Sequence, residues 1–202
     1  MQVIDWDEYI NPGSSSFTRS SLPLAVTIGV FDGVHRGHQA LIQQICEPRS
    51  SLYTAFLPTV VTFRENPLKI LQPDTFTGDI YTLEQKLHTF QTLGVGQVIL
   101  IDFNRKFSKI NGRDFIDLLI NSRPVKLIVL GRNFRCGHQL DAGIEEIQDL
   151  ADTRGVEVLV VPPVMDEGLP VSSSRIRQAF AAGRIAEAER LMARPDESIV
   201  SH

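Results

Sequence analysis

Two histidines stand in the segment G-V-F-D-G-V-H-R-G-H, which runs from Gly29 to His38. The segment follows an apolar run rich in branched side chains and precedes a helical pattern, so it is predicted to form the turn between a buried strand and the N-terminus of a helix. The first turn of a helix presents unpaired N–H groups and a partial positive charge, which attract anions. Glycines on either side of His35 allow the backbone and a phosphate to approach closely. We therefore expect both imidazoles to supply side-chain donors at a phosphate site.

A second anion site is predicted from the segment V-S-S-S-R-I-R, which spans Val171 to Arg177 and opens another helical pattern. Serines in a first helical turn cap the helix and offer hydroxyl donors, and the guanidinium groups of Arg175 and Arg177 suit phosphate. The alternative interpretation is an ordinary capped helix with solvated arginines, because serine-rich N-caps are common.

The histidine pair also has other interpretations. A pair spaced H-x-x-H has little specificity and is compatible with two ordinary surface or core histidines. A zinc site is disfavoured because the chain has no H-E-x-x-H motif, because Cys46 and Cys136 are far from the pair in sequence, and because the other histidines are dispersed. No Walker motif G-x-x-x-x-G-K-[ST] occurs either. The surrounding glycines favour phosphate chemistry.

The elements that must position these residues alternate between strands and helices. Branched apolar runs predict five buried strands: Ala25–Phe31, Val60–Phe63, Gln97–Phe103, Lys126–Gly131 and Glu157–Pro163. Helical periodicity lies between them, and Gly94 and Gly155 fit C-terminal caps of two of the helices. This alternation predicts an α/β fold with a five-stranded parallel sheet and helices on both faces.

A sheet of this kind binds ligands beyond the carboxyl ends of its strands, where the strand order reverses. The histidine turn follows the first of the five strands. The loops after the other strands are expected to converge on the same crevice, namely Arg64–Pro67, Asp102–Ser108, Gly131–Gly137 and Pro162–Arg177. The Ser, Gly and Pro residues between positions 11 and 21 predict a loop before the first core strand.

The composition predicts one soluble domain. The 202 residues are 43% hydrophobic and carry a formal net charge of −4, with scattered Lys and Arg, which argues against a nucleic-acid partner. The chain shows neither an apolar stretch of membrane-spanning length nor a basic leader segment at its N-terminus. Its two cysteines are expected to be reduced thiols. We expect a cytoplasmic enzyme that acts on small molecules, without a membrane or an obligate protein partner.

Five motifs in order resemble those of the adenylyltransferase module of bacterial FAD synthetases, in the H-x-G-H nucleotidyltransferase superfamily. G-V-F-D-G-V-H-R-G-H resembles the phosphate signature of that family, and V-S-S-S-R-I-R resembles its S-S-T-x-x-R triphosphate motif. Between them, V-V-T-F-R-E-N-P, T-L-E-Q-K-L and G-R-N-F-R-C-G resemble the second-strand motif, the helix before the third strand and the flavin-side loop. The resemblance covers most of the chain and implies a Rossmann-like nucleotidyltransferase fold.

The resemblance implies Mg²⁺-assisted transfer of AMP from ATP to FMN, which gives FAD and pyrophosphate. It implies that His35 and His38 stabilise charge on the transferring α-phosphoryl group, and that Ser173, Ser174 and Arg177 hold the β- and γ-phosphates. The ATP side implied in this way comprises Gly29, Phe31, Asp32, His35, Gly37, His38, Ser173, Ser174 and Arg177.

On the flavin side, the resemblance implies that Asn133 lies beside the flavin phosphate and the metal, and it adds Asn133 to His35, His38 and Arg177 as the catalytic set. Phe134 and Arg135 would line the FMN site. The Mg²⁺ ligands themselves are expected to come mainly from the substrate phosphates.

The chain departs from the family pattern at two places. The second-strand motif of the family usually ends P-H-P, whereas here Asn66 stands at the histidine position. An amide still donates a hydrogen bond but carries no charge, so we expect Asn66 at the FMN site, with a changed contribution to FMN affinity or to the choice of acceptor. The family also usually carries a riboflavin kinase β-barrel, and this chain ends at His202. We expect residues 1–194 to form an adenylyltransferase domain without riboflavin kinase activity, as a single-activity enzyme or as part of a longer chain, and residues 195–202 to be a disordered tail.

Two functions besides FMN adenylyltransferase stay open. One is a related nucleotidyltransferase that acts on another phosphorylated acceptor, which would not be expected to share G-R-N-F-R-C-G. The other is a non-catalytic flavin- or nucleotide-binding module, against which the intact His35, His38 and Arg177 argue.

Overall fold

The computed structural model describes residues 1–11, 21–48 and 55–193. The predicted loop at residues 12–20 and the predicted tail at residues 195–202 lie outside the described residues. No described helix is long and apolar enough to cross a membrane.

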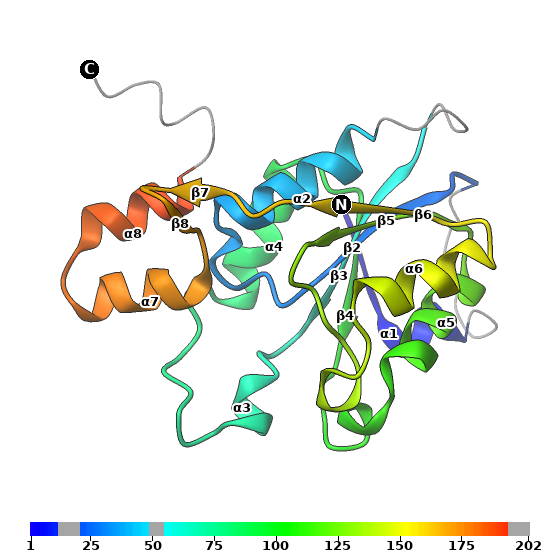
Figure 1. Ribbon diagram of the computed structural model, residues 1–202, viewed down its shortest axis with the longest axis horizontal. Helices are drawn as coiled ribbons and strands as arrows, with labels where there is room; N and C mark the ends of the chain where they lie inside the picture. The colour runs from blue at the N-terminus through cyan, green and yellow to red at the C-terminus, as the bar shows by residue number, and fades with distance from the viewer. Residues whose placement is uncertain (12–20, 49–54, 194–202) are drawn as a thin grey trace.

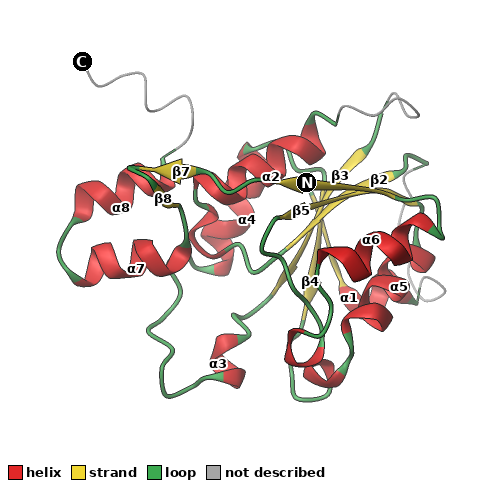
Figure 2. Ribbon diagram, viewed as in Figure 1, coloured by secondary structure: helices red, strands yellow, loops and turns green. Residues whose placement is uncertain are grey.

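Six parallel strands form the central sheet (Figures 1 and 2). Their order across the sheet is β1 (Gln2–Asp5), β4 (Gln97–Ile101), β3 (Leu57–Phe63), β2 (Leu24–Ile28), β5 (Val125–Gly131) and β6 (Glu157–Val161). The central strands are almost continuously buried, as expected for a parallel sheet covered on both faces. The predicted α/β class with a parallel sheet is confirmed.

The predicted number of five strands is wrong, because β1 adds a sixth at the edge of the sheet. This strand is four residues long, and only Ile4 in it is buried. Such a short segment has no apolar run to reveal it. Its pairing with β4 is a tertiary feature that periodicity does not report.

Helices cover both faces of the sheet, as predicted. On one face lie α2 (Arg36–Cys46) and α4 (Leu83–Thr92), and on the other lie α1 (Trp6–Ile10), α5 (Gly112–Ser122) and α6 (Ile144–Asp152) (Figure 1). Each face has its own apolar core, one built around Ile42, Ile45 and Phe90 and the other around aromatic and branched residues of α1, α5 and α6. The turns after α4 and α6 place Gly94 and Gly155 at positive φ, which confirms the predicted caps.

A short helix, α3 (Leu68–Leu71), follows β3, and single 3-10 turns occupy Asp32–Val34 (η1), Phe107–Lys109 (η2) and His138–Leu140 (η3). Residues 165–192 then form a C-terminal unit beside the sheet (Figure 1). It contains the hairpin β7 (Met165–Asp166) and β8 (Leu169–Pro170), followed by α7 (Ser173–Ala181) and α8 (Ile185–Met192). The two helices bury their own small apolar core, which includes Ile176 and Leu191.

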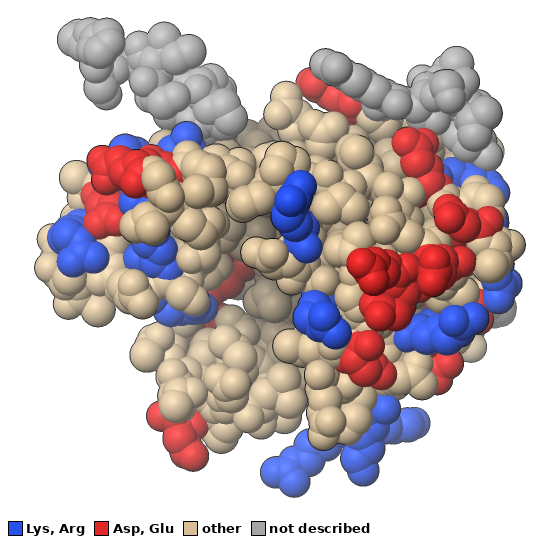
Figure 3. Space-filling view, viewed as in Figure 1, with Lys and Arg blue, Asp and Glu red and all other residues tan. Residues whose placement is uncertain are grey.

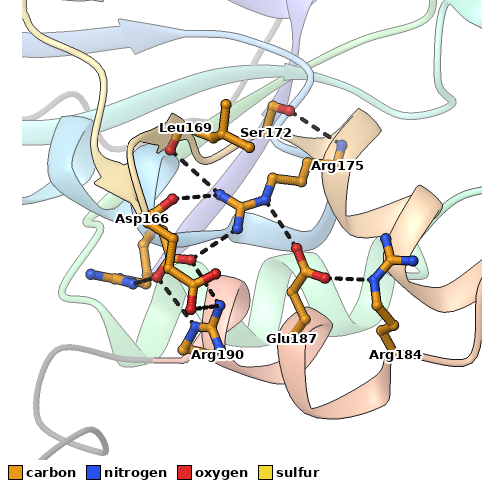
Figure 4. A network of polar contacts seen from close by, with 9 residues as sticks. Asp166, Leu169, Ser172, Arg175, Arg184, Glu187 and Arg190 are labelled. Carbon is orange, nitrogen blue, oxygen red and sulfur yellow. Dashed lines mark hydrogen bonds and ion pairs between the residues drawn. The ribbon is translucent and has the colours of Figure 1, made fainter.

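Asp166 holds this C-terminal unit together and joins it to the sheet. Its carboxylate accepts from Arg175 on α7 at 3.0 Å and from Arg190 on α8 at 3.1 Å (Figure 4). Arg36 at the start of α2 donates to the same carboxylate at 3.1 Å. The Asp166 side chain is only 8% exposed, so three cations converge on one poorly solvated carboxylate. Asp166 thereby fixes α7 relative to α2.

We expect the substitution Asp166→Asn to lower the free energy of unfolding by about 2 kcal/mol, because three charge-assisted hydrogen bonds lose their anion in a partly buried site. Urea unfolding measures the change. Hydrogen bonds from Arg190, and then from Arg175, hold the pKa of Asp166 below its ordinary range. The wild type should therefore have the higher free energy of unfolding above about pH 4. This advantage over Asp166→Asn should disappear as the pH falls through the lowered pKa of Asp166.

The matched control is Glu167→Gln, because Glu167 also pairs with Arg190 but is 70% exposed. This substitution should change the unfolding free energy by less than about 0.5 kcal/mol. Equal effects of the two substitutions would contradict the role given to Asp166.

Candidate active site

The predicted site residues gather at the carboxyl edge of the sheet. From β2 the chain continues outward to β3 and β4, whereas β5 and β6 lie on the other side of β2, so the strand order reverses between β2 and β5. The histidine turn follows β2, and the loop at residues 132–137 follows β5. The serine-rich start of α7 is brought to the same edge, since Ser173 donates to the backbone carbonyl of Asp32 at 3.0 Å. The loops after β3 and β4 reach the same edge, because Pro67 and Phe103 line one cavity with Gly29 and Asn133. The predicted convergence of the loops is confirmed.

The turn after β2 is built from unusual backbone conformations. Phe31 and Val34 have positive φ values of 54° and 36°, and Gly33 has a φ of 77°. A Cβ at Gly33 would lie 2.9 Å from the side chain of Ile80, so both the conformation and the packing require glycine there. The ring of Phe31 is fully buried and packs edge-on against His38 and Phe90. The resemblance to FAD synthetases places Phe31 on the ATP side, and its buried ring supports the histidine turn from the interior of the protein.

His35 and His38 form a stacked pair at the N-terminus of α2. Their ring centroids lie 3.6 Å apart with an angle of 15° between the planes. His35 is the N-cap of α2, and its Nδ1 accepts a hydrogen bond from the backbone N–H of His38 at 3.3 Å. Because Nδ1 accepts, a neutral His35 carries its proton on Nε2. A Cβ at Gly37 would lie 3.2 Å from the His35 ring, so glycine leaves room for the stack.

Both imidazoles are neutral at physiological pH. Burial lowers the pKa of His35 to about 4, and His35 is only 5% exposed. Burial, then the proximity of His35 and Lys86, lowers the pKa of His38 well below its ordinary value. The Nδ1 atom of His38 is buried without a hydrogen-bond partner among the described residues. The pair can therefore act as oriented neutral donors, not as permanent cations.

Arg177 is held at the site by Asp32. Its guanidinium group forms an ion pair with the Asp32 carboxylate and donates to the carbonyl of Gly78 at 3.2 Å. Asp32 also accepts from the backbone N–H groups of Ile80 and Tyr81 at 2.8 and 3.3 Å. Burial raises the pKa of Asp32, and these donors oppose that rise. A bound phosphate would therefore interact with Arg177 while the Asp32 carboxylate holds the guanidinium group in place.

Arg175 has a structural role that the sequence did not indicate. Its guanidinium group binds Asp166 and donates through Nε to Glu187 at 3.1 Å (Figure 4). The side chain is 13% exposed, which also contradicts the alternative picture of solvated arginines for this residue. Ser172 is the N-cap of α7 and accepts from the backbone N–H of Arg175, so the predicted serine cap is confirmed.

Two cavities adjoin the anion-directed residues. Figure 3 shows a hollow between the C-terminal unit and the rest of the molecule, and its surroundings carry scattered charges of both signs. A cavity of about 660 Å³ lies between α7 and the loop before α4, and its lining includes Ser174, Arg177 and Gly78. A second cavity of about 550 Å³ is more apolar and lies over the carboxyl ends of β2 and β5.

The second cavity, which we call the aromatic cavity, is lined by residues from four loops. Its walls include the side chains Phe63, Phe103, Phe107 and Phe134. Gly29 and Val30 of the histidine turn belong to the same lining. Of the predicted flavin-side residues, Asn133, Phe134 and Arg135 line this cavity, whereas Asn66 is not part of its lining. Arg135 donates to the carbonyl of Leu140 at 2.8 Å.

Asn66 is held in place as a local cap. It is 6% exposed, and its Oδ1 accepts from the backbone N–H of Leu68 at 3.1 Å at the start of α3. Its neighbour Pro67 lines the aromatic cavity. The amide oxygen thus shapes the loop that borders the cavity.

Lys86, which was not among the predicted site residues, is buried behind the histidine turn. Its ammonium group donates to the carbonyl of Val30, to the Thr62 hydroxyl and to the carbonyl of Phe63, at 3.3, 3.3 and 2.9 Å. Burial lowers its pKa to about 8. A signal was present in the sequence, because Lys86 falls three residues after Leu83 and four before Phe90, on the apolar face of α4.

The sheet, the reversal of strand order and the anion-directed turn define a Rossmann-like nucleotide-binding domain. A family model for FAD synthetase matches residues 18–175. The chain is 32% identical over 171 residues to a bifunctional riboflavin kinase/FMN adenylyltransferase from Escherichia coli K12, covering 84% of this chain and 54% of that protein. A protein described in the same words from Pseudomonas fluorescens is 32% identical over 170 residues, with the same coverage.

A solved structure described as a macrolide-efflux protein from Streptococcus pneumoniae has a TM-score of 0.78 and 30% sequence identity to this chain, covering 95% of this chain and 62% of that one. The present chain spans about half the length of the curated relatives it matches. It belongs to the FAD synthetase family.

We expect the pH dependence of stability to reveal the neutral His35. Its pKa of about 4 lies below the ordinary histidine value, so the unfolded chain binds more protons in the window between the two values. The free energy of unfolding therefore falls as the pH is lowered through this window, and His35 accounts for about 2 kcal/mol of the fall between about pH 7 and about pH 5.

In His35→Asn, asparagine can still cap α2 but does not titrate. Urea unfolding should therefore show a smaller decrease in the free energy of unfolding between these pH values. The same loss in both proteins would show that His35 is not buried in its neutral form.

Proposed function

We propose that this chain transfers the adenylyl group of ATP to FMN, forming FAD and releasing pyrophosphate. One observation carries the proposal: the aromatic cavity, which suits a flat apolar ring system, shares Gly29 and Val30 with the histidine turn, which suits phosphate. A flavin ring in this cavity would direct its phosphate toward Asn133 and the turn. Membership of the FAD synthetase family supports the same substrates. We take residues 1–194 as the adenylyltransferase domain.

In the proposed reaction, a phosphate oxygen of FMN attacks the α-phosphorus of ATP. The new P–O bond forms as the bond to the β-phosphate oxygen breaks, and pyrophosphate carries away the electron pair. Such a transfer depends on positioning and charge stabilisation and needs no nucleophilic side chain. His35 and His38 would donate hydrogen bonds to the α-phosphoryl oxygens, while Ser173, Ser174 and Arg177 would hold the leaving pyrophosphate.

The residues present fit a Mg²⁺ ion that is carried mainly by the substrates. Among the described residues, no three His, Cys, Asp or Glu side chains gather into a metal site. The oxygens of Asp32 are already engaged by Arg177 and two backbone N–H groups, whereas Asn133 is exposed at the cavity and offers an amide oxygen. Mg²⁺ commonly takes most of its ligands from water and phosphate and would neutralise charge on the triphosphate.

We further propose that this chain acts in the cytoplasm and does not itself phosphorylate riboflavin. In the described residues, one edge of the sheet combines the histidine turn with the aromatic cavity, and this combination suits adenylyl transfer. The thiols Cys46 and Cys136 are both free, and burial raises their pKa values, so they suit a reducing compartment.

The proposed function is tested by incubating the purified chain with ATP and Mg²⁺, and with either FMN or riboflavin. Chromatography should show FAD and pyrophosphate in equal amounts from FMN, and no flavin product from riboflavin. Failure to form FAD, together with AMP transfer to another phosphorylated acceptor, would replace the proposal with a related nucleotidyltransferase. Binding of FMN or ATP without any pyrophosphate release would favour a non-catalytic module.

We expect His38→Ala to lower turnover about a hundred- to a thousand-fold at saturating substrate, because losing one oriented donor to developing oxyanion charge costs about 3 to 4 kcal/mol. Steady-state FAD formation measures the effect. The control is His88→Ala, which removes an exposed imidazole from α4 and should leave turnover near that of the wild type. Near-normal turnover in His38→Ala would remove His38 from the reaction.

A further inference from the structure

Lys86 is a buried cation that donates hydrogen bonds to the turn after β2 and to the last two residues of β3. It lies on the face of α4 that packs toward the sheet, and the residue is 8% exposed. An ammonium group has three N–H donors, and here each of the three acceptors is close to the carboxyl edge of the sheet. Thr62 also donates to the carbonyl of Val30 at 3.0 Å, so the acceptors are joined to each other.

No carboxylate among the described residues forms an ion pair with this ammonium group. The charged or titratable groups that act on it through space are Asp32 from η1, Asp79 from the loop before α4, and His38 from α2. Burying a charge without a counter-ion is costly unless all its donors are satisfied. An apolar residue at this position of α4 would avoid that cost. We therefore infer that the ammonium group does more than fill space in the core.

The acceptors show what the ammonium group connects. Val30 belongs to the histidine turn and lies directly before Phe31, whose ring contacts His38. Phe63 is the last residue of β3, and the loop that follows it contains Asn66. Val30 and Phe63 both line the aromatic cavity. Lys86 thus joins the histidine turn after β2 to the carboxyl end of β3, where the loop that contains Asn66 begins.

Transfer between two bound substrates depends on this relative placement. The attacking oxygen and the phosphorus must be aligned, and a displacement of about 1 Å can lower the rate about a hundred-fold. A positive charge behind the turn also favours the accumulation of negative charge in front of it.

We propose that Lys86 is a positioning residue for adenylyl transfer, which fixes the histidine turn against the carboxyl end of β3 and places a positive charge behind the phosphate site. The proposal rests on the proposed function for its kinetic consequence. Its structural consequence, the joining of the histidine turn to the end of β3 and so to the start of the following loop, is independent of the reaction.

The first test compares Lys86→Met with the wild type in FAD formation and in binding. Methionine has a similar length but lacks the charge and the donors. The turnover number should fall about 10- to 100-fold, while the dissociation constants for FMN and ATP, measured by calorimetry, stay within about threefold of wild type. The control is Lys126→Met at the opposite end of the sheet, in β5, which should keep wild-type kinetics. Wild-type turnover in Lys86→Met would overturn the proposal, and FAD formation by the wild type in the same assay keeps the proposed function separate from this outcome.

The second test uses hydrogen exchange of backbone amides in the unliganded proteins. Amides in residues 29–34 and 64–68 should exchange at least about tenfold faster in Lys86→Met than in wild type or Lys126→Met, because both loops lose their shared anchor. Unchanged exchange in both loops would overturn the proposal whether or not the chain makes FAD.

The third test needs only the folded wild type and therefore remains available if Lys86→Met does not fold. Burial lowers the pKa of Lys86 to about 8, so kcat/KM for ATP should decline as the pH rises through that value and the ammonium group loses its charge. A profile that stays flat from about pH 7 to about pH 9.5 would overturn the proposal. Where Lys86→Met folds, its lower kcat/KM should lack this decline, and an identical decline in the variant would assign the titration to another group.

Discussion

The hydrogen bond from the backbone N–H of His38 to Nδ1 of His35 is the interaction on which the site depends. It caps α2, orients the first imidazole and leaves its Nε2 as the donor. The stack then fixes the second imidazole against the first. The backbone around the pair is also constrained. Phe31 has a left-handed backbone conformation, and Gly37 lacks the Cβ that would crowd the His35 ring. Most of the local sequence G-V-F-D-G-V-H-R-G-H serves this one arrangement.

Three positively charged side chains of α4 and α7 are held by groups of the protein itself. Arg177 is paired with Asp32, Arg175 with Asp166, and Lys86 with two carbonyls and a hydroxyl. Held in this way, the cations do not need to be ordered when a polyanionic substrate arrives, so less conformational entropy is lost on binding. The neutral histidines can donate hydrogen bonds to phosphate oxygens without adding further positive charge, and therefore without repelling the cations.

The C-terminal unit contributes through its attachment as well as through its residues. Asp166 ties the start of α2 to α7 and α8, and Ser173 donates to the carbonyl of Asp32 in the histidine turn. The serine-rich start of α7 is thus held near the histidine turn. The two predicted anion sites are far apart in sequence but lie next to each other at the carboxyl edge of the sheet.

The sequence predicted the features that are local or periodic. Long branched runs indicated the central strands, and glycines marked the ends of α4 and α6. It did not predict the edge strand β1, whose four residues become a strand only by pairing with β4. Nor did it assign Arg175 to Asp166, since that pairing is made by a hairpin nine residues away in the chain. Lys86 escaped notice because a lysine in an amphipathic helix is expected on its solvated face, although its spacing placed it on the other.

A crystal structure with FMN and an ATP analogue whose α,β-bridging oxygen is replaced by a methylene group would show the geometry of the proposed transfer. We expect the flavin ring in the aromatic cavity and an FMN phosphate oxygen about 3 to 3.5 Å from the α-phosphorus, in line with the bridging methylene. The imidazoles of His35 and His38 should face the α-phosphoryl oxygens, with Arg177 on the terminal phosphates. A flavin bound elsewhere, or a triphosphate whose α-phosphorus lies away from the histidine pair, would contradict the proposed transfer.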